Sequence, residues 1–527
     1  MEFLREIIPR EYQRKIFETC SQKNCLVVLP TGLGKTLIAL MLVIDRMKKF
    51  PGEKAVFLAP TKPLAEQHLN YFKKHLPELF ADIQLFTGEI NSDKRKKIWQ
   101  TADIIFSTPQ CVANDLKKNL YDLKNVCLLV EDECHRCVKN YDYNYVAWKY
   151  KGQSLHPRIL GITASPGYDT MKIKEICRNL SIEEVELRTR ESPDVKKYLK
   201  ELEFEKVSVD FPPDMEEIRH LLKKIFDSYV EELRKRKVLF VPPTKTNLIN
   251  LQKKISLSLN RGEKNFNYLL GMSACAQAVK IQHLLELLET QTLFGFNKYL
   301  KELFNQAEKN QSRGVVKLVS KPEFNFAYIK SHELLAKNIE HPKIGELIKI
   351  LNREKEENGN LKAIVFTQFR DTALIISKRI NQQGILKAKI FVGQVKKSSG
   401  IKDLETTGLT QKEQKKIIDD FSSGKIDILC ATCIAEEGLD IPEVNVVLFY
   451  EPIPSAIRSI QRAGRTARLM EGKMIVLVAK KTRDEAYFYV SKARERKMHS
   501  AINLIKEDLA DKKIDFSEGK ETQEKLA

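Results

Sequence analysis

Several features that define other classes of protein are missing or scarce in this sequence. No run of about 18 consecutive apolar residues occurs, so no transmembrane helix is predicted. The 10 cysteines are too sparse for a disulfide scaffold, and those inside apolar runs, such as Cys127, are predicted to be reduced and buried. No short-period repeat is visible. The first residues, MEFLREIIPREYQ, place charges where a signal peptide needs an apolar stretch, so we expect a cytoplasmic location.

The chain is instead long and basic. Its 527 residues exceed what one hydrophobic core normally supports, which predicts several domains. Hydrophobic residues make up 43% and charged residues 30%, as in ordinary globular proteins. The net charge of +19 favours a polyanionic partner, with nucleic acid the first candidate and an anionic membrane the second.

The N-terminal part alternates short apolar runs with amphipathic segments. The segments 36–49 and 63–76 have helical spacing and lie between apolar runs that end in polar turns. Strands that alternate with helices predict a parallel sheet covered on both faces, with functional loops after the carboxyl ends of the strands. The predicted strands lie in NCLVVLP, KAVFLAP, ADIIFSTP, VCLLVEDE and RILGITAS.

The pattern changes twice along the rest of the chain. Helical spacing dominates from about Pro213 to about Lys337, and the α/β alternation resumes after His341 with strands predicted in KAIVFTQ, AKIFVGQ, DILCAT, VNVVLFY and KMIVLVAK. The helical part carries more basic than acidic residues. The sequence therefore predicts an α/β domain over 1–190, a linker over 191–212, a helical insertion over 213–340, a second α/β domain over 341–495 and a polar tail over 496–527.

The segment LPTGLGKT, residues 29–36, follows a predicted strand and opens a predicted helix, as a phosphate-binding loop does. Gly32 and Gly34 let backbone N–H groups turn toward phosphate oxygens. Lys35 brings a positive charge to the β- and γ-phosphates, and Thr36 offers a hydroxyl to Mg²⁺. The predicted ATP-binding residues of this loop are Pro30, Thr31, Gly32, Leu33, Gly34, Lys35 and Thr36.

The segment LLVEDECHRC, residues 128–137, supports two interpretations. It ends in Cys-x-x-Cys, and a second such pair occurs at 430–433, so four cysteines could hold a zinc ion or an iron–sulfur cluster. The same segment places Asp132 and Glu133 directly after an apolar strand. There an aspartate can hold Mg²⁺ and the next carboxylate can polarise the attacking water. The upstream phosphate loop favours the second interpretation over the metal-cysteine site and over a merely solvated strand end.

DECH, residues 132–135, resembles the DExH box of superfamily 2 helicases, and the other motifs of that superfamily follow in order. The resemblance implies that His135 reports the nucleotide state to a second motor lobe. Arg10 and Gln13, in PREYQ, match the motif that reads adenine. Thr163 and Ser165, in TAS, match the motif that couples hydrolysis to strand movement. The C-terminal block supplies the remaining implied ATP-site residues, with the arginine fingers last: Gly438, Asp440, Gln461, Arg465 and Arg468.

A narrower resemblance is carried by LPTGLGKTLIA, APTKPL, TASPG, FVGQ, LTQKEQK and FYEPIPSAIRSIQR. These segments are similar to the archaeal helicase Hef and the Fanconi-anaemia M-type translocases. The resemblance implies an α/β fold of two RecA-like parallel-sheet motor domains with an all-helical insertion between them. It also implies an ATP- and Mg²⁺-dependent DNA helicase or translocase, nucleoid-associated, that acts on forked, junction or single-stranded DNA in fork repair and recombination.

The same resemblance points to the nucleic-acid contacts. The helical insertion is expected to act as a thumb for branched DNA, with basic clusters at 234–237, 253–254 and 313–321 as candidate phosphate contacts, although each cluster can also be an ordinary solvated surface. Family motifs place DNA-contacting threonines in both lobes. They are Thr61, Thr87, Thr108, Thr367 and Thr432.

Two alternatives to a DNA helicase remain to be weighed. Helicases of the RIG-I and Dicer type share an inserted helical domain, so a double-stranded-RNA-stimulated ATPase is the second hypothesis. A DNA-binding scaffold with a vestigial ATPase is the third, and the intact Lys35, Asp132, Glu133 and Arg465 argue against it. ERKMHSA, residues 495–501, lacks the closing aspartate of the nuclease motif found in full-length relatives, so no nuclease activity is expected. A sliding-clamp or nuclease partner stays open, and no membrane partner is expected.

Overall fold

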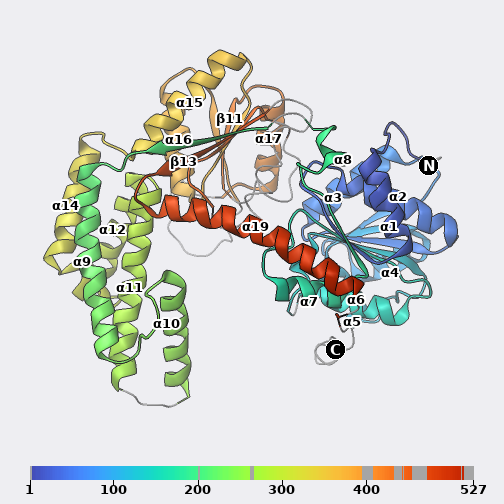
Figure 1. Ribbon diagram of the computed structural model, residues 1–527, viewed down its shortest axis with the longest axis horizontal. Coiled ribbons are helices and arrows are strands. Elements are labelled where there is room, and N and C mark those ends of the chain that lie inside the picture. The colour runs from blue at the N-terminus through green and yellow to red at the C-terminus, as the bar shows by residue number, and fades with distance from the viewer. Residues whose placement is uncertain are drawn as a thin grey trace.

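The computed structural model describes residues 3–139, 141–199, 202–261, 266–393, 408–432, 442, 444–453, 472–511 and 513–514. Two parallel β-sheets, each flanked by helices, and a separate helical bundle make up this part of the chain (Figure 1). Among the described residues, no helix is both long and apolar enough to span a bilayer. The predicted architecture of two parallel-sheet domains with a helical insertion is confirmed.

The first domain is built on a seven-stranded parallel sheet in the order β3-β4-β2-β5-β6-β1-β7. Alternate residues of one strand enter different cores, since Leu26 packs in one apolar cluster and Val27 in another, so both faces of the sheet are covered. The strands are β1 Cys25–Val28, β2 Lys54–Leu58, β3 Ile83–Phe86, β4 Ile104–Ser107, β5 Val126–Asp132, β6 Ile159–Thr163 and β7 Glu184–Leu187. The helices are α1 Glu11–Gln22, α2 Lys35–Lys49, α3 Lys62–His75, α4 Ser92–Thr101, α5 Pro109–Lys117, α6 Asp142–Gln153, α7 Thr170–Leu180 and α8 Pro193–Lys196.

All five strands predicted for this domain are present, and two further strands were missed. Both missed strands form edges of the sheet, β3 at one side and β7 at the other. In β7, which has the sequence EVEL, only Val185 is buried. A strand at the edge of a sheet is less covered than a central strand and therefore contains fewer apolar residues. Periodicity alone therefore gave no signal for it.

The helical bundle, residues 213–336, has an apolar core of its own. The long helices α9 and α11 pack against each other, and a continuous cluster from Met215 to Leu334 fills the space between the helices. Its helices are α9 Pro213–Lys235, α10 Lys245–Asn260, α11 Phe266–Thr290, α12 Leu293–Glu308, α13 Arg313–Val319 and α14 Pro322–Ala336.

The second domain carries a six-stranded parallel sheet in the order β10-β11-β9-β12-β13-β8. The five strands predicted after His341 are confirmed. The strands are β8 Leu202–Val209, β9 Ala363–Phe366, β10 Ala388–Phe391, β11 Ile428–Ala431, β12 Val446–Phe449 and β13 Gly472–Ala479. The helices are α15 Pro342–Asn358, α16 Arg370–Gln382, α17 Gln411–Ser422 and α19 Arg483–Ala510.

Two predicted boundaries differ from the structure. The segment 191–212, predicted as a linker, contains α8 of the first domain and β8, which pairs in parallel with β13 as an edge of the second sheet. The segment 496–527, predicted as a polar tail, begins inside α19, whose residues Met498, Ile502 and Ile505 are buried in the first domain's core. These few apolar residues have polar neighbours in the sequence. The sequence pattern therefore did not indicate a helix that is buried on one face only.

Candidate ATP-binding and hydrolysis site

The phosphate loop lies between β1 and α2. Gly32 and Gly34 have φ values of 87° and 81°, a left-handed conformation that strains residues with a Cβ atom. Lys35 begins the 15-residue helix α2, and its Nζ donates to the Leu29 carbonyl at 2.9 Å. The N-terminus of α2 therefore presents backbone N–H groups and a lysine at one point, an arrangement suited to an anion.

The start of α1 is fastened to this loop. The Gln13 amide donates to the Leu33 carbonyl at 3.0 Å and accepts from the Arg10 backbone N–H at 2.8 Å, while the Tyr12 hydroxyl donates to the same carbonyl at 2.8 Å. A Cβ atom on Gly34 would overlap with the amide nitrogen of Gln13. Gln13 thus lies at the loop, as the PREYQ motif predicts, and the recognition of adenine by Arg10 and Gln13 stays a prediction.

A histidine that the sequence analysis did not single out joins the two predicted Mg²⁺ ligands. His68 Nδ1 lies 3.3 Å from the Thr36 hydroxyl, and His68 Nε2 lies 2.8 Å from Asp132 Oδ2. His68 stands on α3, which follows β2, and β2 is the sheet neighbour of β5 that ends in Asp132. Its position directly after the matched segment APTKPLAEQ was the available signal.

The DExH box and the TAS motif meet through Glu133. His135 Nδ1 lies 3.2 Å from the Glu133 carboxylate and 3.1 Å from the Thr163 hydroxyl, and that hydroxyl donates to Glu133 at 3.4 Å. The Ser165 backbone N–H donates back to Thr163 Oγ1 at 3.2 Å. Because β5 and β6 are neighbours in the sheet, the loops that follow them converge. Glu133, His135, Thr163 and Ser165 therefore form one network.

The residues present fit Mg²⁺ at the phosphate loop. A hydroxyl and a carboxylate oxygen, on Thr36 and Asp132, are brought to the same histidine, and oxygen atoms are the ligands that Mg²⁺ prefers. Mg²⁺ usually takes few protein ligands and completes its shell with water and substrate phosphates. In the part of the chain that the structure describes, no group of three or more His, Cys, Asp or Glu side chains could hold a metal by itself.

The cysteines of LLVEDECHRC do not form such a metal site. Cys134 and Cys137 are buried, and the Cys137 thiol donates to the Glu131 carboxylate at 2.7 Å. Burial raises the pKa of the Cys137 thiol well above its usual range, which keeps it a thiol, whereas metal binding needs a thiolate. Cys430 is buried in β11, and Cys433 lies outside the described residues. The interpretation of this segment as a Mg²⁺ and water-activating site is the better supported one.

The remaining predicted ATP-site residues belong to the second domain. They lie outside the residues that the structure describes, so their roles stay predictions. They are Gly438, Asp440, Gln461, Arg465 and Arg468.

The predicted DNA-contacting threonines fall into two groups. Thr61 and Thr108 precede the first turns of α3 and α5, after β2 and β4, where backbone N–H groups and hydroxyls can meet a phosphate. Thr87, Thr367 and Thr432 are buried, and the Thr367 hydroxyl is within 3.3 Å of both Gln291 and Glu451. For these three, the expectation of a hydroxyl contact to DNA does not match their position in this conformation.

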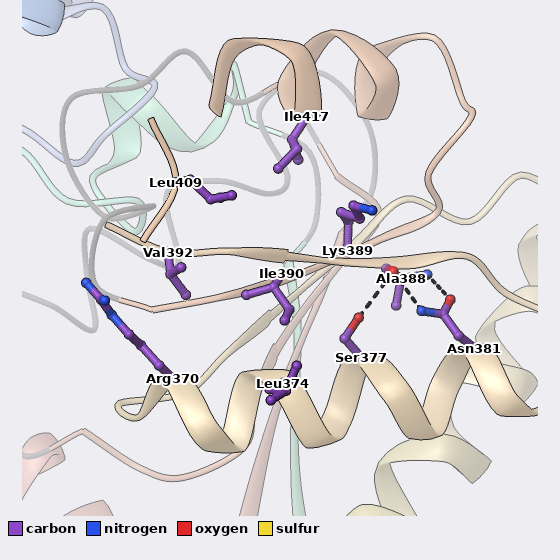
Figure 2. Close-up of a pocket in the computed structure, with 10 residues that line it drawn as sticks. All are labelled: Arg370, Leu374, Ser377, Asn381, Ala388, Lys389, Ile390, Val392, Leu409 and Ile417. Carbon is purple, nitrogen blue, oxygen red and sulfur yellow. Dashed lines mark hydrogen bonds between the residues drawn. The ribbon is translucent and has the colours of Figure 1, made fainter. Parts of the chain in front are cut away.

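A pocket of about 280 Å³ lies away from this site, between α16, α17 and the edge strand β10 (Figure 2). Its polar groups are used internally, since Ser377 and Asn381 donate to the Ala388 carbonyl and Arg370 donates to the Gly393 carbonyl. We assign no ligand to it.

Comparisons with known proteins agree with this arrangement. Three family models match: DEAD/DEAH box helicase over residues 10–173, the helical bundle of ATP-dependent RNA helicases over 214–338, and the helicase conserved C-terminal domain over 342–470. The crystal structure of the Pyrococcus furiosus Hef helicase domain superposes with a TM-score of 0.70 and 40% identity, covering 93% of this chain and all of that one.

Curated relatives from archaea and eukaryotes match over most of the chain. A Methanocaldococcus jannaschii protein named as an ATP-dependent RNA helicase is 36% identical over 93% of this chain and 60% of its own length. The DNA helicase fml2 of Schizosaccharomyces pombe is 31% identical over 91% of this chain and 62% of its own. The Fanconi anemia group M homologue of Mus musculus is 30% identical over 94% of this chain and 26% of its own.

The chain thus spans less than two thirds of the length of these curated relatives but the whole of the solved Hef helicase domain. The matched segments carry the phosphate loop, the DExH box and the TAS motif whose geometry is described above. This chain belongs to the Hef and Fanconi-anaemia M family of DEAD/DEAH-box helicases.

Proposed function

We propose that the chain is an ATP-dependent DNA helicase or translocase that acts on forked or branched DNA in the repair of stalled replication forks. The observation that carries the proposal is the network around Glu133. It joins the box expected to activate water to the motif expected to move the strand, through His135 and Thr163. A protein that only bound DNA would have no need for this connection.

The side chains of the first domain suit phosphoryl transfer. When bound, Mg²⁺ would be held by Thr36 and Asp132 and would neutralise charge on the transferred phosphate. Lys35 exchanges the Leu29 carbonyl for phosphate oxygens. Glu133 accepts a proton from the attacking water, and His135 and Thr163 hold its carboxylate in place. Arg465 and Arg468 of the second domain are proposed to supply charge to the same phosphate when the domains close.

The helical bundle is proposed to select the DNA structure. Lys253 and Lys254 are exposed on α10, which packs on α11 on the side of the bundle turned toward the first domain (Figure 1). The cluster at 234–237 is a weaker candidate, because Lys235 and Arg236 form ion pairs with Glu231 and Glu232 on the same helix. Counterions leave the DNA when a lysine binds one of its phosphates. A lysine whose charge is already neutralised by a neighbouring carboxylate releases fewer of them than an exposed lysine without such a neighbour.

The name of the fungal relative, a DNA helicase, supports a DNA substrate, and the RNA name of the archaeal relative makes the choice of nucleic acid a point to test. The test is ATP hydrolysis by the whole chain with a forked DNA, a linear DNA duplex and an RNA duplex of equal length. We expect the fork to stimulate hydrolysis most, and a labelled strand to be displaced from the fork only when ATP is present.

Lys35→Ala is the control, because loss of the phosphate-binding charge should abolish both signals while leaving DNA binding intact. Equal or greater stimulation by duplex RNA would favour the RNA-directed alternative of the RIG-I and Dicer type. An absence of ATP hydrolysis by the unmodified chain with every nucleic acid would favour the scaffold alternative.

A further inference from the structure

The C-terminal helix α19 has two buried ends and an exposed middle. Asp484 and Phe488 are buried at its start and Met498, Ile502 and Ile505 toward its end, whereas residues 489–497 include none that is buried. A helix of 28 residues is about 42 Å long. Figure 1 shows it running from the second sheet and the bundle across to the first domain. A rigid element therefore connects parts of the molecule that are far apart.

The first turn of α19 is fixed to the second domain and the bundle together. Asp484 pairs with Lys343 of α15 at 2.8 Å, and both side chains are fully buried. Lys343 also donates to the Thr290 carbonyl at the end of α11 at 2.7 Å. The Arg483 guanidinium donates to the Gln282 carbonyl and side-chain oxygens, also on α11, at 2.7 and 2.6 Å. A displacement of α11 therefore acts directly on the start of α19.

The last turns of α19 are part of the first domain. Met498, Ile502 and Ile505 recur at i, i+4 and i+7, which makes an apolar stripe on one face of the helix. This stripe packs in the same core as Ile173 and Ile176 of α7. Outside the core, Lys174 of α7 pairs with Asp508 at 2.8 Å.

Where α19 reaches the first domain, it contacts the segment that contains the TAS motif. The Ser165 hydroxyl donates to the Met498 sulfur at 2.9 Å, and the Arg494 guanidinium lies 5.0 Å from the centre of the Tyr168 ring. Residues 494 and 498 are one turn apart on the same face of the helix. Ser165 is fully buried, so its hydroxyl cannot donate to water. The Met498 sulfur accepts its hydrogen bond instead.

The contact continues to the catalytic carboxylate. Ser165 is bonded through its N–H to the Thr163 hydroxyl, and that hydroxyl reaches Glu133. We propose that Met498 and Arg494 are positioning residues, through which α19 transmits the position of the bundle and second domain to Ser165 and so to Glu133. The proposal rests on the proposed function, because it assigns the coupling between DNA binding and ATP hydrolysis to a helix outside the helicase motifs.

The test compares three variants of the whole chain. Met498→Leu keeps the apolar volume and removes the acceptor of Ser165, and Arg494→Ala removes the stacking partner of Tyr168 from a half-buried position. Ile505→Val is the matched control, because it loosens the same buried stripe about two helical turns beyond Met498. Thermal denaturation of all three measures any loss of stability that is unrelated to positioning.

We expect Met498→Leu and Arg494→Ala to lower the ratio of fork-stimulated to DNA-free ATP turnover by about 3- to 30-fold, the range for residues that change coupling without touching a ligand. KM for ATP and Kd for the fork should stay within about twofold, whereas Ile505→Val should leave the ratio unchanged. The double variant of Ser165→Ala with Met498→Leu should lower this ratio no further than Ser165→Ala alone. Both variants lose the same contact, the one between Ser165 and Met498.

A second readout needs no DNA. Amide hydrogen exchange of residues 164–168 in the nucleotide-free chain should quicken in Met498→Leu and Arg494→Ala and stay unchanged in Ile505→Val. If the unmodified chain shows no DNA stimulation but exchange follows this pattern, the proposed function fails and the positioning contact stands. Equal exchange and equal stimulation ratios in all three variants would overturn the proposal.

Discussion

At the scale of single residues, the site depends on a few positions where backbone conformation and side-chain contact coincide. Gly34 is one such position. It has a left-handed backbone, directly precedes α2, and a Cβ atom added to it would overlap with the Gln13 amide. His68 is another, since it holds Thr36 and Asp132 in one hydrogen-bonded chain.

Gly34→Ala should weaken ATP binding at least about tenfold, because the new methyl group strains the backbone and displaces Gln13 from the phosphate loop. Gly52→Ala is the matched control, since Gly52 has nearly the same φ of 84° and a Cβ atom added there would meet no other atom within 4 Å. Equilibrium binding of a fluorescent ATP analogue measures both. A Gly52→Ala variant as defective as Gly34→Ala would show that general backbone strain is responsible.

His68→Ala should lower kcat for ATP about tenfold or more, because Asp132 loses the side chain that orients it beside Thr36. His75→Ala is the comparison on the same helix. His75 is also buried, but its ring contacts the Arg5 carbonyl, far from the phosphate loop. Steady-state kinetics should show a kcat loss for His68→Ala alone. A similar kcat loss in both variants would assign the effect to α3 as a whole.

Glu131 should make the stability of the nucleotide-free chain depend on pH. Burial raises its pKa from 4.5 to about 8 in the folded chain, and the Cys137 thiol and the charge of Lys151 offset only part of this. Between these two values the folded state keeps a proton that the unfolded state releases, so this contribution to stability falls as pH rises from about 5 to 8. The melting temperature of Glu131→Gln should fall less over this range than that of the unmodified chain. Glu302→Gln, on an exposed position of the bundle, should follow the unmodified chain.

The sequence was sufficient for those residues whose role depends on their own motif. Lys35 and Asp132 were found because a loop or a strand end specifies them locally. His68 was not found, because its partners are 32 and 64 residues away and meet it only through the order of strands in the sheet. The sequence predicted the central strands of that sheet but not their order.

At the scale of elements, the sequence predicted the central strands and the edge strand β10, but missed the edge strands β3, β7 and β8 and the C-terminal half of α19. The strand β8 has exposed or half-buried residues throughout, because it packs at a sheet edge with charged side chains turned outward. The C-terminal half of α19 buries one narrow stripe within a polar sequence. A run of consecutive hydrophobic residues indicates an element that is buried on all sides. Elements that are buried on one side only lack such a run and are therefore not detected by it.

Ile502→Asp should destabilise the chain by about 3 kcal/mol or more, because it places an unpaired charge in the core that α19 shares with α7. Leu504→Asp is two residues away on the same helix and is 46% exposed, so its effect should be within about 0.5 kcal/mol. Chemical denaturation measures both. Equal stability of the two variants would mean that this end of α19 does not pack on the first domain in solution.

At the scale of the whole molecule, the effect of the net charge of +19 on nucleic-acid binding depends on where the basic side chains lie. Lysines on the bundle are the candidates for contact with branched DNA, whereas lysines elsewhere add to solubility and long-range attraction. The bundle itself could be predicted from helical spacing. The side of it that faces the first domain could not, because that side depends on how three separately folded parts are joined.

Lys253→Ala combined with Lys254→Ala should weaken binding to a fork and reduce the slope of log affinity against log salt by about 1.5 to 2, as expected for two lost phosphate contacts. Lys73→Ala combined with Lys74→Ala removes the same charge from exposed positions on α3 and should change the slope little. Fluorescence anisotropy with a labelled fork over a salt series measures both. Equal losses would mean that total charge, rather than the bundle, determines affinity.

Neither motor domain is continuous in the sequence, and this has a consequence for synthesis. The second sheet takes β8 from before the bundle, and the first domain takes the end of α19 from some 300 residues after its own last strand β7. During translation the face of α7 around Ile173 and Ile176 therefore stays uncovered until residues 498–505 of α19 have left the ribosome. The first domain is therefore completed only after the bundle and the strands of the second sheet have been made.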